Sequence, residues 1–162
     1  CISIEHDYIY GIWGGMASPA ILPNRNVVAA IRRGWPTLPF HWTEIYCSEE
    51  GGLTWHFLSR VSDWGAPGHL LVLKDERLMC TYGRRVSPYG IRAKISDDGG
   101  RIWGPEIIVR DDGGSWDLGY PRTALLPDGK VIAVYYFNEA KDITQCDGGV
   151  RHIAASIFEV PY

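Results

Sequence analysis

The feature that most constrains the fold of this chain is an internal repeat. The segment 48–55, SEEGGLTW, matches the segment 96–103, SDDGGRIW, with serine, an acidic residue, glycine and tryptophan in the same register. Two apolar stretches joined by a short polar turn precede each copy, and this hairpin pattern occurs three times, at 21–28, 72–79 and 125–132. A period of about 50 residues with about four strands per unit is typical of β-propeller blades.

We therefore predict an all-β chain, a partial β-propeller of about three four-stranded blades. The blades are expected at about 17–60, 68–110 and 121–158, because one such sheet buries both faces only when neighbouring sheets stack on it. Residues 1–10 alternate loosely like one more strand, which would be the spare outer strand of a preceding blade. The chain, 1–162, is then a single partial propeller domain.

Charge and hydropathy argue against two classes of partner. The 16 basic and 19 acidic residues give a net charge of −3 and are mixed along the chain, without a basic run that could neutralise a phosphate backbone. We expect no nucleic-acid partner. Apolar stretches fall short of the ~18 residues that cross a bilayer, so we expect no membrane partner either.

The cysteines do not suggest a metal or redox site. Cys1, Cys47, Cys80 and Cys146 lack the close spacings of a zinc knuckle or a redox pair, and we interpret them as unpaired thiols. Cys47 and Cys80 lie in predicted strands and suit small core positions. Since no regular oxygen-rich loop suggests calcium, we expect no metal and no cofactor.

The repeated motif also carries a family resemblance. Ser-x-Asp-x-Gly-x-x-Trp at Ser96, Asp98, Gly100 and Trp103 resembles the Asp-box of the sialidase (neuraminidase) superfamily with BNR repeats, and the first copy departs from it only by Glu50. The segments 63–69, 88–93, 116–122 and 151–155 also resemble the C-terminal half of bacterial exo-sialidase-like proteins.

This resemblance implies half of a six-bladed propeller that removes terminal sialic acid from glycans, with a secreted or periplasmic location. The Asp-box itself suits a structural role, because a short acid in a tight turn accepts backbone N–H groups. In the family these boxes lie opposite the active site. We therefore expect the site on the loops at the other end, at 33–41, 61–67, 83–89, 111–120 and 137–149.

Tyr120 is the candidate nucleophile. In sialidases a tyrosine near the start of the final blade's first strand has this role, and Tyr120 stands at a matching position, although Pro121 follows it where the enzymes more often have serine. A phenol avoids repulsion by the sugar carboxylate if a nearby carboxylate takes its proton. Glu44, Asp117 and Asp63 are the candidates for that carboxylate. The alternatives are a rim or core tyrosine and aspartates that cap turns.

Arginines on the same loops are candidate ligands for a sugar carboxylate, which several forked guanidinium groups grip best. Arg32, Arg33, Arg84, Arg85, Arg92, Arg122 and Arg151 fall at or near this end. We select Arg85, Arg92 and Arg122, together with His152 for a sugar hydroxyl and Trp64 and Tyr89 for stacking on a sugar. The alternatives are solvated charges, ion-pair partners and a structural histidine.

Three functions remain open from the sequence. One is a sialidase-like hydrolase acting on a glycan that ends in an acidic sugar, although the family's catalytic acid and first arginine usually lie in N-terminal blades. The second is a non-catalytic glycan-binding module. The third is an inactive fragment, either a homodimer or a piece that lacks N-terminal blades, because half a ring would expose apolar blade faces.

Overall fold

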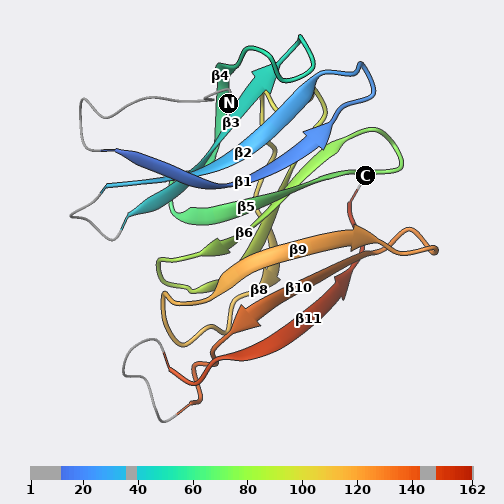
Figure 1. The fold of residues 1–162 in the computed structure, drawn as a ribbon. Helices are drawn as coiled ribbons and strands as arrows, with labels where there is room; N and C mark the ends of the chain where they lie inside the picture. Colours follow the sequence, from blue (N-terminus) through green and yellow to red (C-terminus); the bar gives the residue numbers. More distant parts are fainter. Residues whose placement is uncertain (1–11, 36–39, 143–148, 162) are drawn as a thin grey trace.

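A computed structural model describes residues 12–35, 40–142 and 149–161. Within these ranges the chain forms antiparallel strands arranged in three sheets (Figure 1). The first sheet has the order β1-β2-β3-β4. Its strands are β1 (Trp13–Ile21), β2 (Val27–Gly34), β3 (His41–Ser48) and β4 (His56–Ser62).

The second and third sheets repeat this meander. The second has the order β5-β6-β7-β8, with β5 (Gly65–Val72), β6 (Leu78–Arg84), β7 (Gly90–Ser96) and β8 (Ile107–Arg110). The third has the order β11-β10-β9, with β9 (Gly119–Leu125), β10 (Val131–Phe137) and β11 (His152–Phe158). These three sheets confirm the predicted all-β partial propeller. In the described part of the chain the third blade has three strands. The predicted spare strand at 1–10 lies outside the described residues.

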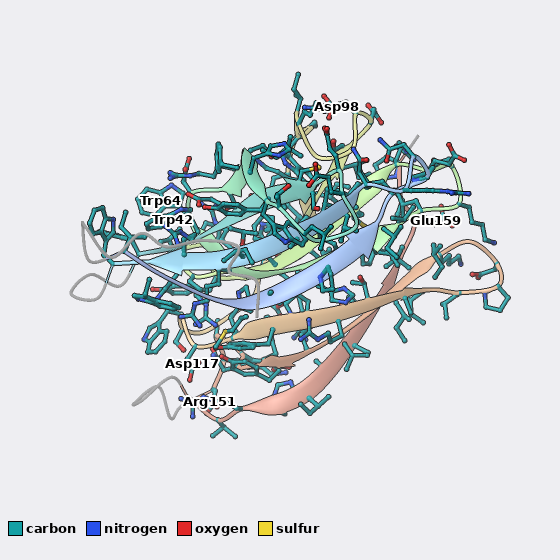
Figure 2. All side chains as sticks on the ribbon, turned by 45° about the horizontal axis from the view of Figure 1, so that its top comes forward. Trp42, Trp64, Asp98, Asp117, Arg151 and Glu159 are labelled. Atoms are coloured by element: carbon teal, nitrogen blue, oxygen red, sulfur yellow. The ribbon has the colours of Figure 1, made fainter. Side chains whose placement is uncertain are left out.

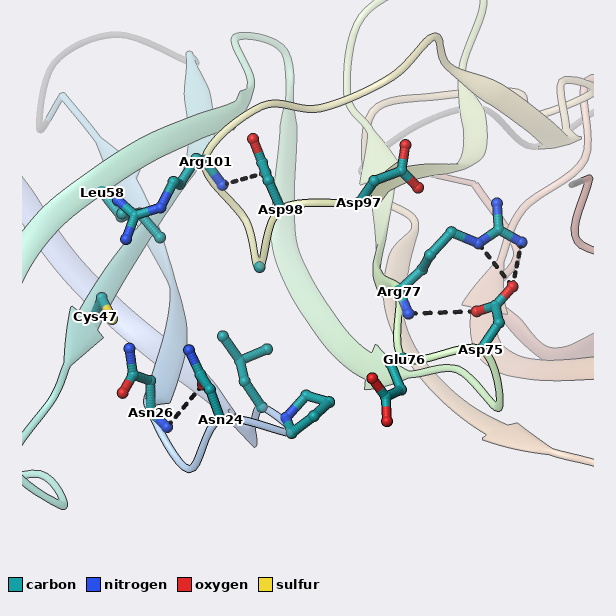
Figure 3. Close-up of a pocket in the computed structure, with 13 residues that line it drawn as sticks. Asn24, Asn26, Cys47, Leu58, Asp75, Glu76, Arg77, Asp97, Asp98 and Arg101 are labelled. Atoms are coloured by element: carbon teal, nitrogen blue, oxygen red, sulfur yellow. Dashed lines mark hydrogen bonds and ion pairs between the residues drawn. The ribbon is translucent and has the colours of Figure 1, made fainter.

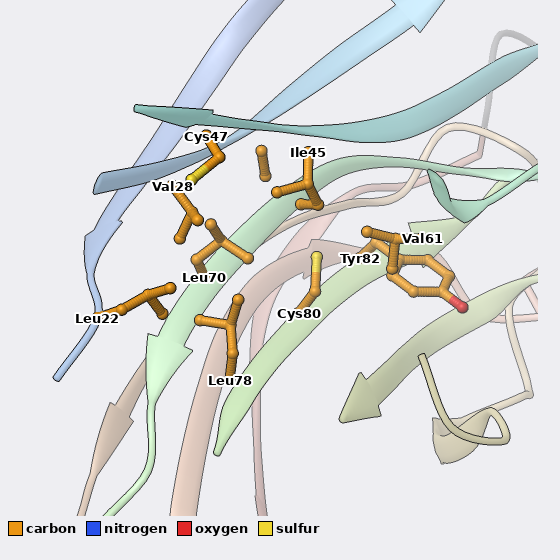
Figure 4. Packing of buried hydrophobic residues seen from close by; sticks show 10 residues of the cluster. Leu22, Val28, Ile45, Cys47, Val61, Leu70, Leu78, Cys80 and Tyr82 are labelled. Atoms are coloured by element: carbon orange, nitrogen blue, oxygen red, sulfur yellow. The ribbon is translucent and has the colours of Figure 1, made fainter. Parts of the chain in front are cut away.

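The sheets stack face to face, and the first strands β1, β5 and β9 lie side by side along one edge of the stack (Figure 1). In the first interface Val28 and Ile45 interleave with Leu70 and Leu78 (Figure 4). Each fully buried aliphatic side chain stabilises the fold by about 1.5–3 kcal/mol. Cys47 and Cys80 are buried free thiols in the same cluster, as the sequence indicated.

The second interface uses the alternation of strand β10. Val131, Ala133, Tyr135 and Phe137 are buried against the second sheet, while the residues between them face away from it. Leu118 closes this core at the end where β9 begins and is fully buried. The period of two along one strand therefore separates a core face from an open face.

Each blade begins slightly earlier than the sequence predicted, at Trp13, Gly65 and Gly119. Strand β1 begins at Trp13 rather than at 17, and a register shift between Gly15 and Ser18 interrupts its pairing with β2. Strand β8 begins only at Ile107, after the end of the repeated segment 96–103. The reason is that Trp103 belongs to the preceding turn, where its indole Nε1 donates to the Ser59 hydroxyl at 3.0 Å.

The turns in the two repeated segments, 48–55 and 96–103, are stabilised by different hydrogen bonds. One carboxylate oxygen of Asp98 accepts the backbone N–H groups of Arg101 at 3.0 Å and Ile102 at 2.9 Å. Glu50, one methylene longer, instead accepts the hydroxyl of Thr54 at 3.0 Å. The role of these acids is therefore to close turns.

Candidate functional site

The two ends of the sheets carry different chemistry (Figure 2). Asp98 and Glu159 lie at one end, whereas Trp42, Trp64, Asp117 and Arg151 lie at the other (Figure 2). The end with Asp117, here called the loop end, is where β2, β6 and β10 finish and where β5 and β9 begin. It is the end to which the sequence assigned the candidate site.

A close backbone approach brings the second and third sheets together at the loop end. A Cβ atom placed on Gly119 would lie 2.9 Å from the Cα atom of Gly83, and one on Gly83 would lie 2.9 Å from the Cα atom of Gly119. Gly119 also has φ +114°, a conformation that side chains rarely adopt. Only glycines permit this contact, and it fixes where Tyr120 begins strand β9.

Tyr120 lies against an arginine of the first sheet. Its hydroxyl oxygen accepts a hydrogen bond of 2.8 Å from Nη1 of Arg32, and its backbone has φ 52°. The guanidinium of Arg32 also lies over the ring of Trp13, 4.9 Å from the centroid, and its Nη1 is 3.3 Å from the sulfur of Met16. The hydrogen bond from Arg32 therefore fixes the orientation of the Tyr120 phenol.

Arg85 lies on the other side of Tyr120. Its Nε donates to the carbonyl oxygen of Ala66 at 2.8 Å, and its Nη1 donates to that of Trp116 at 3.2 Å. The guanidinium carbon is 5.5 Å from the ring centroid of Tyr120 and 5.9 Å from that of Trp116. Arg85 is 7% exposed; its guanidinium interacts with the hydroxyl of Tyr136, and its buried Nη2 makes no hydrogen bond of standard geometry to the described atoms.

A second tyrosine connects this cluster to a carboxylate. The hydroxyl of Tyr136 donates to Asp117 at 2.5 Å, and the ring of Tyr136 lies 5.5 Å from that of Tyr120. Arg151 pairs with the other carboxylate oxygen of Asp117. Burial, and then the hydrogen bond to Asp117, raise the pKa of Tyr136 to about 12. Tyr136 therefore remains a neutral donor at physiological pH.

The charge of Asp117 is stabilised in turn. Burial raises the pKa of its carboxyl group, but the hydrogen bonds from Tyr136 and Arg151 and the charges of Arg151 and Arg85 outweigh this effect, so the pKa is lowered. Asn138, fully buried, donates to the Asp117 carbonyl oxygen at 2.7 Å and accepts the N–H of Ser115 at 2.8 Å. These bonds hold the loop that carries Trp116 and Tyr120.

Two of the expected carboxylates have other partners. Glu44 lies on β3, where it pairs with Arg33 at 3.3 Å and accepts the indole N–H of Trp42 at 2.7 Å. It makes no described contact with Tyr120. Asp63 is exposed, and it pairs with Arg60 at 3.0 Å.

The remaining candidates are dispersed. Arg92 is 2% exposed and bonds to Glu106 and to the carbonyl oxygens of Ile91 and Arg110 within the second sheet. Tyr89 packs against the core of the second interface. His152 lies 3.9 Å from Glu139, and Arg122 is exposed on β9. The structure therefore groups Tyr120, Asp117 and Arg85, with Trp64 beside them, and separates the others.

Arg32 and Tyr136 are members of the cluster that were not selected from the sequence. A signal for both existed, because Arg32, Arg85 and Tyr136 each stand at or just past the end of the second strand of a hairpin. Successive second strands finish at the same end of a stack of meanders, so their last side chains converge.

The opposite end holds a pocket of 340 Å³ between turns of the first two sheets, lined among others by Asn24, Asp75, Arg77, Asp98 and Arg101 (Figure 3). The carboxylate of Asp75 is already paired with Arg77, whose Nε lies 2.8 Å away, and the carboxylate of Asp98 already accepts backbone N–H groups of its own turn. In the described ranges no group of histidine, cysteine and acidic residues is arranged to hold a metal ion. Nor does the described chain contain a helix long and apolar enough to cross a membrane.

Solved structures share the fold of this chain, whereas the comparisons do not assign it to a family. No family model matches the chain, and no curated protein matches it. Among solved structures it is similar to a protein of unknown function from Dyadobacter fermentans, at 34% identity and a TM-score of 0.79. That similarity covers 98% of this chain and 41% of the other.

Two more distant structures belong to carbohydrate-active enzymes. A GH93 α-L-arabinofuranosidase of Fusarium graminearum, in complex with arabinobiose, is 17% identical with a TM-score of 0.64, covering 94% of this chain and 47% of that one. A Hadza microbial sialidase is 14% identical with a TM-score of 0.57, covering 90% and 35%. At such identities the likeness shows the shared fold, and the chain spans less than half the length of these proteins.

Proposed function

We propose that the loop end binds the carboxylate of an acidic sugar between Arg32 and Arg85, as part of a glycan-processing or glycan-binding propeller. One observation carries this proposal. Arg32 and Arg85 are only 8% and 7% exposed, and each has a buried nitrogen that makes no hydrogen bond of standard geometry to the described residues, Nε of Arg32 and Nη2 of Arg85. Buried guanidinium groups with unused donors are costly unless an anion completes them.

The electrostatics support the same conclusion. Burial, and then the positive charge of Arg85, lower the pKa of Arg32. No carboxylate of the described chain forms an ion pair with either arginine. A ligand carboxylate would relieve the repulsion between the two cations and supply charge-assisted hydrogen bonds to both. The glycan-active structural neighbours and the resemblance to sialidases make a sugar acid the most suitable carrier of that carboxylate.

The test compares a sugar acid with its neutral form. We expect N-acetylneuraminic acid or glucuronic acid to bind at least about tenfold more tightly than its methyl ester, because a hydrogen bond to a charged group contributes about 1.5–3 kcal/mol. Arg85→Gln should remove this preference, whereas Arg101→Gln, an exposed arginine at the opposite end, should not. Equal binding of acid and ester, or no binding of either acid, would contradict the proposal.

Hydrolysis by a sialidase-like mechanism is a second candidate, favoured by the bond from Arg32 to the exposed Tyr120 hydroxyl. Through this bond Arg32 orients the Tyr120 oxygen, the atom that would attack the sugar. The described carboxylate nearest in the network, Asp117, reaches Tyr120 only through Tyr136. Turnover of a fluorogenic sialoside that is lost in Tyr120→Phe, with binding retained, would support this candidate. Binding without turnover in the unmodified protein would leave a glycan-binding module.

A further inference from the structure

Exposed aromatic side chains lie at the loop end, and two of them belong to residues whose backbone carbonyl oxygens bond to Arg85. Trp64, Trp116 and Phe40 are 43%, 53% and 39% exposed, although large aromatic side chains normally bury most of their surface. Trp64 and Phe40 form an edge-to-face pair with ring centroids 5.2 Å apart. A grouping of exposed rings at one end of a protein indicates a binding surface rather than a fold requirement.

Arg85 fixes the loops that carry these tryptophans. Its backbone N–H donates to the carbonyl oxygen of Trp64 at 3.0 Å, and its Nη1 donates to that of Trp116 at 3.2 Å. Both loops are therefore bonded directly to the residue proposed to bind the carboxylate. The rings of Trp64 and Phe40, which we call the aromatic corner, are positioned for a ligand group next to the acidic sugar.

The surroundings of the aromatic corner select a neutral ligand group. Asp63, adjacent to Trp64, is paired with Arg60 at 3.0 Å, so their two charges largely offset each other and do not favour a charged sugar of either sign. Sugar rings present an apolar face of C–H groups, and aromatic rings offer a large apolar surface at little conformational cost. The ring centroid of Trp116 lies 5.9 Å from the guanidinium carbon of Arg85, so Trp116 suits the acidic unit itself.

We propose that the site recognises an oligosaccharide rather than a single sugar, with the acidic unit at Arg85 and Arg32 and a neutral neighbouring unit on Trp64 and Phe40. This inference rests on the proposed function and adds a second subsite to it. Trp64 determines the preference for length, and Arg85 determines the preference for charge.

The experiment measures two ligand pairs by calorimetry: N-acetylneuraminic acid with 3′-sialyllactose, and glucuronic acid with cellobiouronic acid. For at least one pair we expect the longer ligand to bind about 2- to 10-fold more tightly, the effect of an aromatic contact of about 0.5–1.5 kcal/mol. Trp64→Ala should abolish this ratio while leaving the affinity for the single sugar unchanged. Trp64→Phe should retain part of it.

Phe57→Ala is the matched control, since Phe57 is an exposed aromatic residue (55%) that pairs with Tyr46 far along the first sheet. It should leave both affinities unchanged. The inference is overturned if both members of each pair bind equally, or if Trp64→Ala weakens the single sugar as much as the longer ligand. Failure of the proposed function looks different, because then none of the four acids binds in an Arg85-dependent manner.

Discussion

The guanidinium of Arg32 and the phenol of Tyr120 form a hydrogen bond of 2.8 Å across 88 residues of sequence. Arg32 belongs to the first sheet and Tyr120 to the third, while Arg85, beside both, follows the second sheet's strand β6. The candidate site therefore exists only when all three sheets are stacked. A substitution that weakens the stacking of the sheets should therefore also disturb the site.

Gly119→Ala should be strongly destabilising. The new Cβ atom would meet the backbone of Gly83 at 2.9 Å in addition to the strain of φ +114°. We expect a loss of about 2–5 kcal/mol in the free energy of unfolding, from left-handed strain and overpacking together. Gly129→Ala is the control, because Gly129 has φ +90° but no near backbone atom. In chemical denaturation Gly129→Ala should lose only about 1–2 kcal/mol of the free energy of unfolding. Equal losses for both variants would contradict the close contact between Gly119 and Gly83.

Asp98→Ala should cost more stability than Glu50→Ala, although both residues occupy the same position of the repeat. Asp98 accepts two backbone N–H groups, whereas Glu50 accepts a side-chain hydroxyl of Thr54. We expect a loss of about 1–3 kcal/mol for Asp98→Ala, from unsatisfied turn amides, and less than about 1 kcal/mol for Glu50→Ala. Thermal unfolding of the two variants measures this difference. A larger loss of stability for Glu50→Ala than for Asp98→Ala would contradict the different roles of the two acids.

Asp117 should make stability depend on pH on the acid side. Because the pKa of Asp117 is lowered in the folded protein, its contribution is fully present above the ordinary aspartate pKa of about 4. That contribution disappears as the pH falls through the lowered value. Asp117→Asn should therefore be less stable than the unmodified protein at neutral pH, with the difference shrinking below about pH 4. A difference that stays constant from neutral to strongly acidic pH would exclude this role.

The outer face of the third sheet should drive association of the isolated chain. Cross-strand pairs of Ile132 with Ile157 and of Tyr136 with Ile153 form a row of apolar side chains on this face, where Ile153 is 74% and Ile157 59% exposed. We propose that a second copy of this chain covers this face. Light scattering should find a dimer or larger species, which Ile153→Glu weakens and Ile102→Glu, in an exposed turn, does not. A monodisperse monomer would contradict this prediction.

The architecture could be predicted because it depends on local signals. Each hairpin combines two apolar strands with a polar turn, and a repeat of about 50 residues imposes stacking of like units. Tyr120, Asp117 and Arg85 could be assigned to one end for the same reason, since the order of strands decides at which end each loop lies.

Other members of the site depend on irregular pairing that no sequence pattern marks. The pairing of β10 with β9 shifts between Val134 and Tyr136, and the pairing of β1 shifts between Gly15 and Ser18, so both bulges re-aim side chains. Glu44, Arg92 and His152 were selected as site residues from their equivalent positions on third strands, and they do lie on third strands. Third strands lie two spacings of about 4.8 Å from the first strands β1, β5 and β9, which explains why these residues find other partners.

The central claim is that Arg32 and Arg85 together bind a carboxylate, and a crystal structure of the protein soaked with N-acetylneuraminic acid or glucuronic acid tests it most directly. The account predicts a carboxylate oxygen within about 2.7–3.2 Å of Nη2 of Arg85, with the second oxygen facing Arg32. A sugar acid bound with its carboxylate away from both guanidinium groups would contradict it.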